Sequence, residues 1–201
     1  TLLAGLASLG LAPLIRTTSA DPTSTPEPTL PEPGAKVFRI GVPAKALTTD
    51  PAITSDVETH RLARQVYQTL IGVDEETGET IPQLAAEWSV SDTGREVIFT
   101  LEPDISFHDG TELTADVVVE NFQRWGTADQ LLGSQFDDVG RLPFSIIFGG
   151  FSSQEACLLE SVEATGELEV TVMLRQPVTN LISALTHPAF SITSPNSWVA
   201  F

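Results

Sequence analysis

Apolar and polar side chains alternate along residues 168–174, where every second residue is leucine or valine. This period of two predicts a β-strand with one buried face. A shorter apolar run at 159–164 precedes it, and the turn at 165–167 contains a glycine. We therefore expect these runs to form a hairpin, and the same pattern predicts a second hairpin across residues 88–101.

Helical periodicity begins after Ser55, which forms a capping-box pattern with Glu58. The predicted helix would end near Gly72. Its apolar stripe is expected to consist of Leu62, Val66 and Leu70, with Ala63 and Tyr67 beside it.

A polar turn follows the predicted strand of residues 97–101. Asp109 can accept a hydrogen bond from the local backbone, and Gly110 tolerates a positive φ. Phe107 is expected to pack beneath this turn. His108 and Asp109 together suggest a metal or acid/base pair, but adjacent residues on an extended segment point to opposite faces. We therefore favour a structural role for the pair over a ligand-binding or catalytic one.

A second helix is predicted from residue 117 to residue 125, because large apolar side chains recur there at helical spacing. Thr114 is the expected N-cap, and Asp116 would complement the helix dipole in the first turn. Gly126 is expected to stop the helix.

Other segments have weaker patterns. Residues 37–42 are predicted to form an opening strand, followed by a loop at 43–54. Short helices are expected at 155–159 and 177–185. Residues 127–151 show no clear periodicity.

The first part of the chain is typical of export. Residues 1–20 are apolar and rich in small residues, with a plausible cleavage site at 18–20, and they predict a signal-peptide-like segment. An uncleaved membrane anchor is the alternative. Residues 21–35 are rich in proline, threonine and glutamate, so they are expected to form an extended linker. Residues 36–201 would then form the folded part.

Composition restricts the chemistry. The chain carries 10 basic and 27 acidic residues, for a formal charge of −17, and this field opposes binding to nucleic acid. The acidity is explained by a solvated surface, with attraction of cationic ligands as the alternative. Cys157 stands alone as an expected buried, inert thiol, and His60, His108 and His187 match no zinc motif. We expect neither metal nor cofactor.

Several landmarks occur in a characteristic order and spacing. They are Thr-Asp-Pro at 49–51, Tyr-Gln-Thr-Leu at 67–70, Pro-x-Leu-Ala-x-x-Trp at 82–88, the run from Phe99 to Gly110 ending in Phe-His-Asp-Gly, the stretch 170–177, and the stretch 187–195. Together they resemble family 5 of the extracytoplasmic solute-binding proteins of ABC importers, which capture oligopeptides, dipeptides and nickel chelates. The resemblance extends over about residues 37 to 195. Gln68, Thr69 and Glu102 depart from the family pattern.

This resemblance implies an α/β, periplasmic-binding-protein-like fold of type II. Members of the family are considerably longer than 201 residues. The chain is therefore expected to hold part of lobe one and most of the extra small subdomain. By itself it is expected to bind ligand weakly or not at all, because the second wall of the cleft is missing. The implied protein is not an enzyme. It would be an extracytoplasmic monomer that binds a peptide or another small solute and delivers it to a membrane permease.

The resemblance also implies which positions face the cleft. The candidates for ligand binding are Ala44, Lys45, Leu47, Trp125, Leu131, His187 and Phe190, with plain packing or loop roles as the alternative. Phe107, His108, Asp109, Gly110 and Asp116 form the structural signature. Other hypotheses stay open: nickel chelates, haem or other solutes on the same fold, a secreted hydrolase using His108 and Asp109, or a surface interaction module.

Overall fold

Residues 159–174 form the predicted hairpin, which contributes half of a four-stranded antiparallel sheet. The computed structural model describes residues 41–132 and 141–198. The strands of this sheet are β4 (Ala85–Val90), β5 (Glu96–Leu101), β6 (Leu159–Ala164) and β7 (Glu169–Leu174), in the order β4-β5-β7-β6. Both predicted hairpins are confirmed, and each is one half of the sheet.

The two hairpins meet along β5 and β7. Phe99 pairs with Val170 at this seam and with Trp88 on the other side of β5. Burial alternates along both strands, and Phe99, Val170 and Val172 are completely inaccessible to solvent. The inner face of the sheet is therefore the floor of the hydrophobic core.

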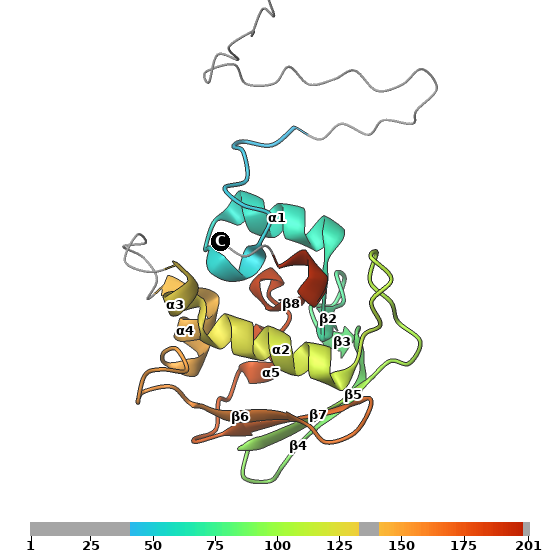
Figure 1. The fold of residues 1–201 in the computed structure, drawn as a ribbon, viewed down its shortest axis with the longest axis vertical. Helices are drawn as coiled ribbons and strands as arrows, with labels where there is room; N and C mark the ends of the chain where they lie inside the picture. The colour runs from blue at the N-terminus through green and yellow to red at the C-terminus, as the bar shows by residue number, and fades with distance from the viewer. Residues whose placement is uncertain (1–40, 133–140, 199–201) are drawn as a thin grey trace, which may run out of the picture. The chain divides into compact units, whose positions relative to one another are not determined.

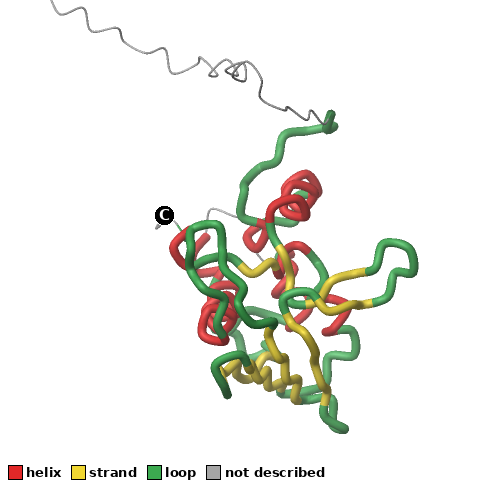
Figure 2. The backbone as a smooth tube through the Cα atoms, turned by 90° about the vertical axis from the view of Figure 1, so that its right-hand side faces the viewer, coloured by secondary structure: helices red, strands yellow, loops and turns green. Residues whose placement is uncertain are grey.

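Helix α2 (Ala115–Gly126) lies across this inner face and packs on β6 and β7 (Figure 1). Thr114 is the N-cap as predicted, and its hydroxyl oxygen accepts a hydrogen bond from the amide of Val117 at 3.4 Å. Val118, Phe122 and Trp125 are buried on one side of the helix. In the view of Figure 2 the helices lie on one side of the sheet, so its other face is left partly open to solvent.

Gly126 is the last residue of α2 rather than a residue that stops it, which corrects the prediction. Its carbonyl accepts a hydrogen bond from Ser152 N at 2.8 Å. A Cβ at this position would overlap Ser152 Oγ and lie 3.3 Å from the ring of Phe144. The glycine is required by close approach of a neighbouring segment, and not by its φ angle.

Replacing Gly126 with alanine is expected to destabilise the chain by about 1 kcal/mol, because overpacking outweighs the better helix propensity of alanine. Urea unfolding measures the change. In the double variant Gly126→Ala, Ser152→Ala the overlapping hydroxyl is gone, so most of the loss should be recovered. A single Gly126→Ala variant that unfolds at higher urea than the parent would refute the close-approach explanation.

Helix α1 (Val57–Val66) starts one residue later than the predicted capping box requires. Asp56, not Ser55, is the N-cap, and its carboxylate accepts a hydrogen bond from Thr59 N at 2.7 Å. An aspartate oxygen reaches the N3 amide as a serine does, so the sequence allowed either residue to cap.

The predicted apolar stripe of α1 is wrong. Leu62 and Val66 are 41% and 50% exposed, whereas the small side chains of Thr59 and Ala63 are buried. The helix packs against the 3-10 turns η1 (Pro51–Ile53) and η4 (Pro188–Phe190), which approach its small residues closely. The face of α1 with small side chains is therefore the buried one, because only small side chains fit against these turns.

Leu70 and Gly72 do not belong to the helix, because the chain turns into short strands after Val66. Strand β1 (Gln68–Thr69) pairs with β8 (Ser191–Ile192), which joins distant parts of the chain. Strands β2 (Ile71–Val73) and β3 (Thr80–Pro82) form a small hairpin. The polar turn between them is ordered by Asp74, whose carboxylate accepts hydrogen bonds from two backbone amides.

The remaining short elements are α3 (Ala128–Leu132), α4 (Pro143–Phe148), α5 (Leu181–Ala184) and η5 (Pro195–Ser197). The described parts of residues 127–151, where no periodicity was visible, thus include two short helices. The helix expected at 155–159 is absent: these residues turn and then enter β6. The helix expected at 177–185 is confirmed only as the single turn of α5.

The predicted signal segment and linker lie outside the described residues, as does most of the opening strand expected at 37–42. Gly41 and Val42, its last two residues, are not in a strand. Residues from Val42 onward belong to one compact unit.

Candidate functional site

The Phe-His-Asp-Gly segment forms a tight turn, as predicted. Phe107 N donates to Thr111 O at 2.8 Å, and Gly110 N donates to Phe107 O at 3.0 Å. Gly110 has a φ of +84°, a value that glycine adopts without strain. Phe107 packs against the core, whereas His108 is exposed. The chain conformation here is set by local hydrogen bonds.

Asp109 connects this turn to the C-terminal segment. One carboxylate oxygen accepts from Thr111 N at 2.9 Å, and the other accepts from Ser194 Oγ at 2.5 Å. These bonds, the one from Ser194 first, lower the pKa of Asp109 to about 2. A carboxyl group with so low a pKa stays ionised and is a poor proton donor or acceptor near neutral pH. The contacts therefore describe a clamp between two chain segments.

Asp109→Ala is expected to lower the melting temperature, whereas His108→Ala should change it little, because among the described residues His108 has no hydrogen-bond partner. The folded-state pKa of Asp109 lies below the ordinary value of 3.8, so its stabilisation is present above that pH and is lost as the pH falls toward 2. The difference in melting temperature between the parent and Asp109→Ala should therefore narrow over this range. Thermal unfolding of both variants at several pH values measures it, and an equal loss in both variants would contradict the clamp.

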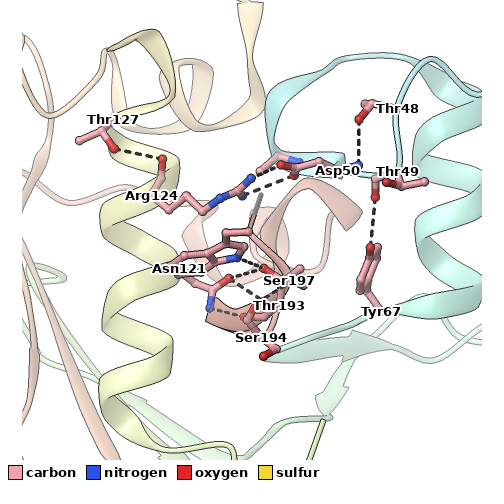
Figure 3. Close-up of polar contacts among 12 residues, drawn as sticks. Thr48, Thr49, Asp50, Tyr67, Asn121, Arg124, Thr127, Thr193, Ser194 and Ser197 are labelled. Carbon is pink, nitrogen blue, oxygen red and sulfur yellow. Dashed lines mark hydrogen bonds and ion pairs between the residues drawn. The ribbon is translucent and has the colours of Figure 1, made fainter. Parts of the chain in front are cut away.

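A second polar cluster joins the N-terminal loop, α2 and the C-terminal segment (Figure 3). Arg124 of α2 forms an ion pair with Asp50, the residue that caps η1. The Arg124 guanidinium also lies 5.4 Å from the ring centre of Trp198. Trp198 in turn donates from its indole nitrogen to Thr193 Oγ1 at 2.8 Å. Both partners of the ion pair are largely shielded from solvent, at 12% and 19% exposure, so the contact constrains the loop well.

Asn121 is the centre of this polar cluster. It is completely buried, and its amide nitrogen donates to Val117 O and Thr193 O at 2.8 and 2.9 Å. Its side-chain oxygen accepts from Thr193 N and Thr193 Oγ1, both at 3.0 Å. The amide thus replaces missing backbone partners of Thr193 and fixes the chain that follows β8 against α2.

A cavity of about 590 Å³ opens between α1, α4, α5 and η4. Two residues predicted from the sequence, His187 and Phe190, lie in its wall. Its lining consists of Ser55, Val57, His60, Arg64, Arg141, Pro143, Ile146, Ile147, Asn180, Ser183, Ala184, Thr186, His187 and Phe190. An apolar hollow with a few polar groups is the usual form of a small-molecule site.

Two histidines meet in this wall. The rings of His60 and His187 pack edge to face, with 4.6 Å between centroids. His60 Nε2 lies 3.1 Å from Pro51 O, and His187 Nδ1 accepts from Ala189 N at 3.2 Å. A neutral His187 therefore carries its proton on Nε2. Burial lowers the pKa of His187 to about 4, with smaller contributions from His60 and Arg64, so this ring is neutral at physiological pH.

The other sequence candidates lie elsewhere. Trp125 is buried behind the cavity wall, where its ring packs edge to face on Phe190 at 5.3 Å. Ala44, Lys45 and Leu47 are exposed on the loop before η1, and Leu131 is 52% exposed on α3. None of these lines the cavity. Their assignment to ligand binding stays a prediction, as does that of His187 and Phe190.

Sequence reasoning missed His60 and Arg64 as wall residues. They are spaced i, i+4 on α1, so they lie on one face of the helix. The helical pattern predicts that Leu62 and Val66 face the core, and it assigns no role to Arg64. The i, i+4 spacing of His60 and Arg64 in a strongly acidic chain was the sequence signal that could have identified them.

Within residues 41–132 and 141–198, no three histidine, cysteine, aspartate or glutamate side chains come together as metal ligands. Cys157 is buried and unpaired. No helix in the same ranges combines the length and apolar character needed to cross a bilayer.

This sheet with its covering helix is a mixed α/β arrangement that is found in type II periplasmic binding proteins. Two solved structures show the likeness. DppA of Helicobacter pylori, in complex with the peptide STSA, matches 74% of this chain and 29% of its own with a TM-score of 0.59 and 21% identity. HbpA2 of Haemophilus parasuis matches 76% of this chain and 30% of its own with a TM-score of 0.58 and 25% identity.

The chain belongs to the bacterial extracellular solute-binding proteins, family 5, whose middle-region model matches residues 79–200. The glutathione-binding protein GsiB of Pectobacterium atrosepticum is 27% identical over 161 residues, which are 80% of this chain and 28% of that protein. A probable peptide ABC transporter periplasmic-binding protein of Sinorhizobium fredii, y4tO, is 34% identical over 87 residues, which are 42% of this chain and 16% of that protein. The chain thus spans under a third of the length of these relatives.

Proposed function

We propose that this chain is part of the substrate-binding component of an ABC importer that captures peptides outside the cytoplasmic membrane. The observation that carries the proposal is membership of the solute-binding family through residues 79–200. The names of the relatives favour small peptides, since one is a glutathione-binding protein and another a probable peptide transporter component.

The cavity between α1, α4, α5 and η4 is the proposed contact surface for the solute. It offers apolar side chains such as Ile146 and Phe190 beside polar ones such as Asn180. Such a surface suits peptides, whose backbone amides need hydrogen bonds while varied side chains need only apolar contact. Binding rather than chemistry is the proposed role, and the bound solute would pass to a membrane permease.

We propose that the protein functions in the extracytoplasmic space. Residues 1–20 would act as the export signal and residues 21–35 as the linker to the folded part. The net charge of −17 argues against nucleic acid as a partner. We propose a monomer, because a protein of this class hands its solute to a permease as a single unit.

A thermal-shift screen with di- to pentapeptides, glutathione included, tests the function. At least one peptide should raise the melting temperature in a concentration-dependent manner. Ile146→Glu should weaken that shift, because Ile146 lines the cavity and is 63% exposed, so the change perturbs little packing. Val90→Glu is the matched control, since Val90 is 48% exposed on β4, outside this cavity.

Nickel chelates and haem belong in the same screen as competitors. A shift with either of these and none with peptides would overturn the ligand class but keep the binding role. Catalytic turnover of a peptide by the chain would overturn the binding role itself.

A further inference from the structure

We propose that the α1–η4 cavity, defined by the lining residues above, selects an anionic solute. Its carboxylate would be held by Arg64 and the His60–His187 pair, and its apolar part would lie against Val57, Ile146 and Phe190. This proposal deepens the proposed function, because it names the chemical class of ligand for the same site.

The first argument is the distribution of charge. Acidic residues outnumber basic ones by 27 to 10 in the whole chain. The cavity lining nevertheless contains two of the ten basic residues and two of the three histidines, and no described lining residue is acidic. Three smaller cavities each include at least one aspartate or glutamate in their walls. The described residues of this wall therefore carry a positive formal charge, although the protein as a whole is strongly acidic.

The second argument is the supply of free donors. The side chain of Arg64 makes no ion pair or hydrogen bond with any residue of the described parts, whereas the side chains of Arg61, Arg95 and Arg124 each pair with a carboxylate. His187 uses Nδ1 as an acceptor for Ala189 N, which leaves the Nε2 proton for another partner. A guanidinium and an imidazole N–H are suited to a carboxylate, because charge-assisted hydrogen bonds are the strong ones.

The third argument is the apolar surface beside these donors. Val57 and Ile146 are 67% and 63% exposed on two different helices, and both line the cavity. Phe190 lies in the same wall but is almost completely buried, so its ring is held in place. Exposed apolar side chains next to unpaired donors describe a site for a molecule with one acidic end and one apolar end.

Binding of an anion has a consequence for His187. The titratable or charged side chains that face this ring are His60 and Arg64 from α1, with Arg141 in the same wall, and no acidic side chain lines the cavity among the described residues. A carboxylate placed here would favour the protonated imidazole and raise its pKa from about 4. Binding would then be coupled to proton uptake, so affinity rises as the pH falls.

The test uses two probes of nearly equal shape, 3-phenylpropionate and 3-phenylpropionamide, on the full 201-residue chain. Their dissociation constants are measured by NMR titration. The acid is expected to bind about tenfold more tightly than the amide, which corresponds to one charge-assisted hydrogen bond. In the same spectra the pKa of His187 should rise when the acid is present and stay unchanged with the amide.

Arg64→Gln and Arg61→Gln form the matched pair of variants. Both lie on α1, but Arg61 pairs with Glu58 and does not line the cavity. Arg64→Gln should abolish the preference for the acid over the amide, whereas Arg61→Gln should keep it.

Equal binding of the two probes, or an equal effect of the two variants, would overturn the anionic preference. Either outcome would still be compatible with the proposed peptide-binding function, provided that at least one peptide raises the melting temperature in the thermal-shift screen. A preference for the acid that Arg64→Gln removes would support the anionic site even if every peptide in that screen failed, so the two proposals fail separately.

Discussion

Asn121→Ala is expected to lower the free energy of unfolding by about 2 to 4 kcal/mol, because the change leaves buried backbone groups of Thr193 without partners. The side chain of Asn121 makes four hydrogen bonds at 2.8 to 3.0 Å and is fully inaccessible to solvent. Water cannot replace these bonds without opening the contact between α2 and the segment after β8. The segment that holds Thr193 and Trp198 should therefore loosen first.

Urea unfolding, followed by circular dichroism and by tryptophan fluorescence, measures this effect. Gln123→Ala is the matched control, since Gln123 is an exposed residue of the same helix. Asn121→Asp adds a sharper test, because a carboxylate can accept from Thr193 but cannot donate to the two carbonyls, and burying its charge is costly. An Asn121→Ala variant as stable as Gln123→Ala would show that the polar cluster does not hold the fold together.

Phe99→Ala is expected to cost about 3 to 5 kcal/mol, the range found when a buried phenylalanine is truncated. Phe99 is 0% exposed on β5 and pairs in register with Trp88 and Val170. It therefore supports the seam between the two hairpins, and truncating its ring would leave a cavity in the hydrophobic core. A loss of this size approaches the whole stability of a small domain.

Thr100→Ala is the control for Phe99→Ala, because Thr100 is the next residue of β5 and points to the opposite, half-buried face. It should cost under about 1 kcal/mol. Hydrogen exchange of β7 amides distinguishes loss of the seam from general loosening. A Phe99→Ala variant that unfolds like the parent would mean that the core does not depend on the β5–β7 contact.

The proposed solute site depends on the same tertiary contacts. η4 carries His187 at its N-cap and Phe190 at its end, and it is placed by the β1–β8 pairing and by the segment that Asn121 holds. α1 carries His60 and Arg64 and packs on η4 through its small residues. Changes at Asn121 should therefore also weaken solute binding without touching the cavity, an effect that the thermal-shift screen can detect.

The failure of the predicted α1 stripe shows a limit of sequence reasoning. Periodicity indicated a helix there, but it could not say which face meets the core. Leu62 and Val66 are more apolar than Thr59 and Ala63, yet the smaller pair is buried because two 3-10 turns approach the helix closely. His60 and Arg64, which were not among the site residues expected from the sequence, lie on the same helix and line the cavity.

The features that the sequence determined by itself are local. Strand alternation at 168–174, the glycine turns of both hairpins, the Thr114 cap of α2 and the turn at Asp109–Gly110 depend on residues a few positions apart, so their patterns are readable in order. Three features depend on tertiary structure alone. They are the β5–β7 pairing, the hydrogen bonds between Asn121 and Thr193, which are 72 residues apart in the chain, and the ring contact of His60 with His187. These contacts join residues far apart in the chain, and they form only where packing brings complementary side chains together, which no local pattern encodes.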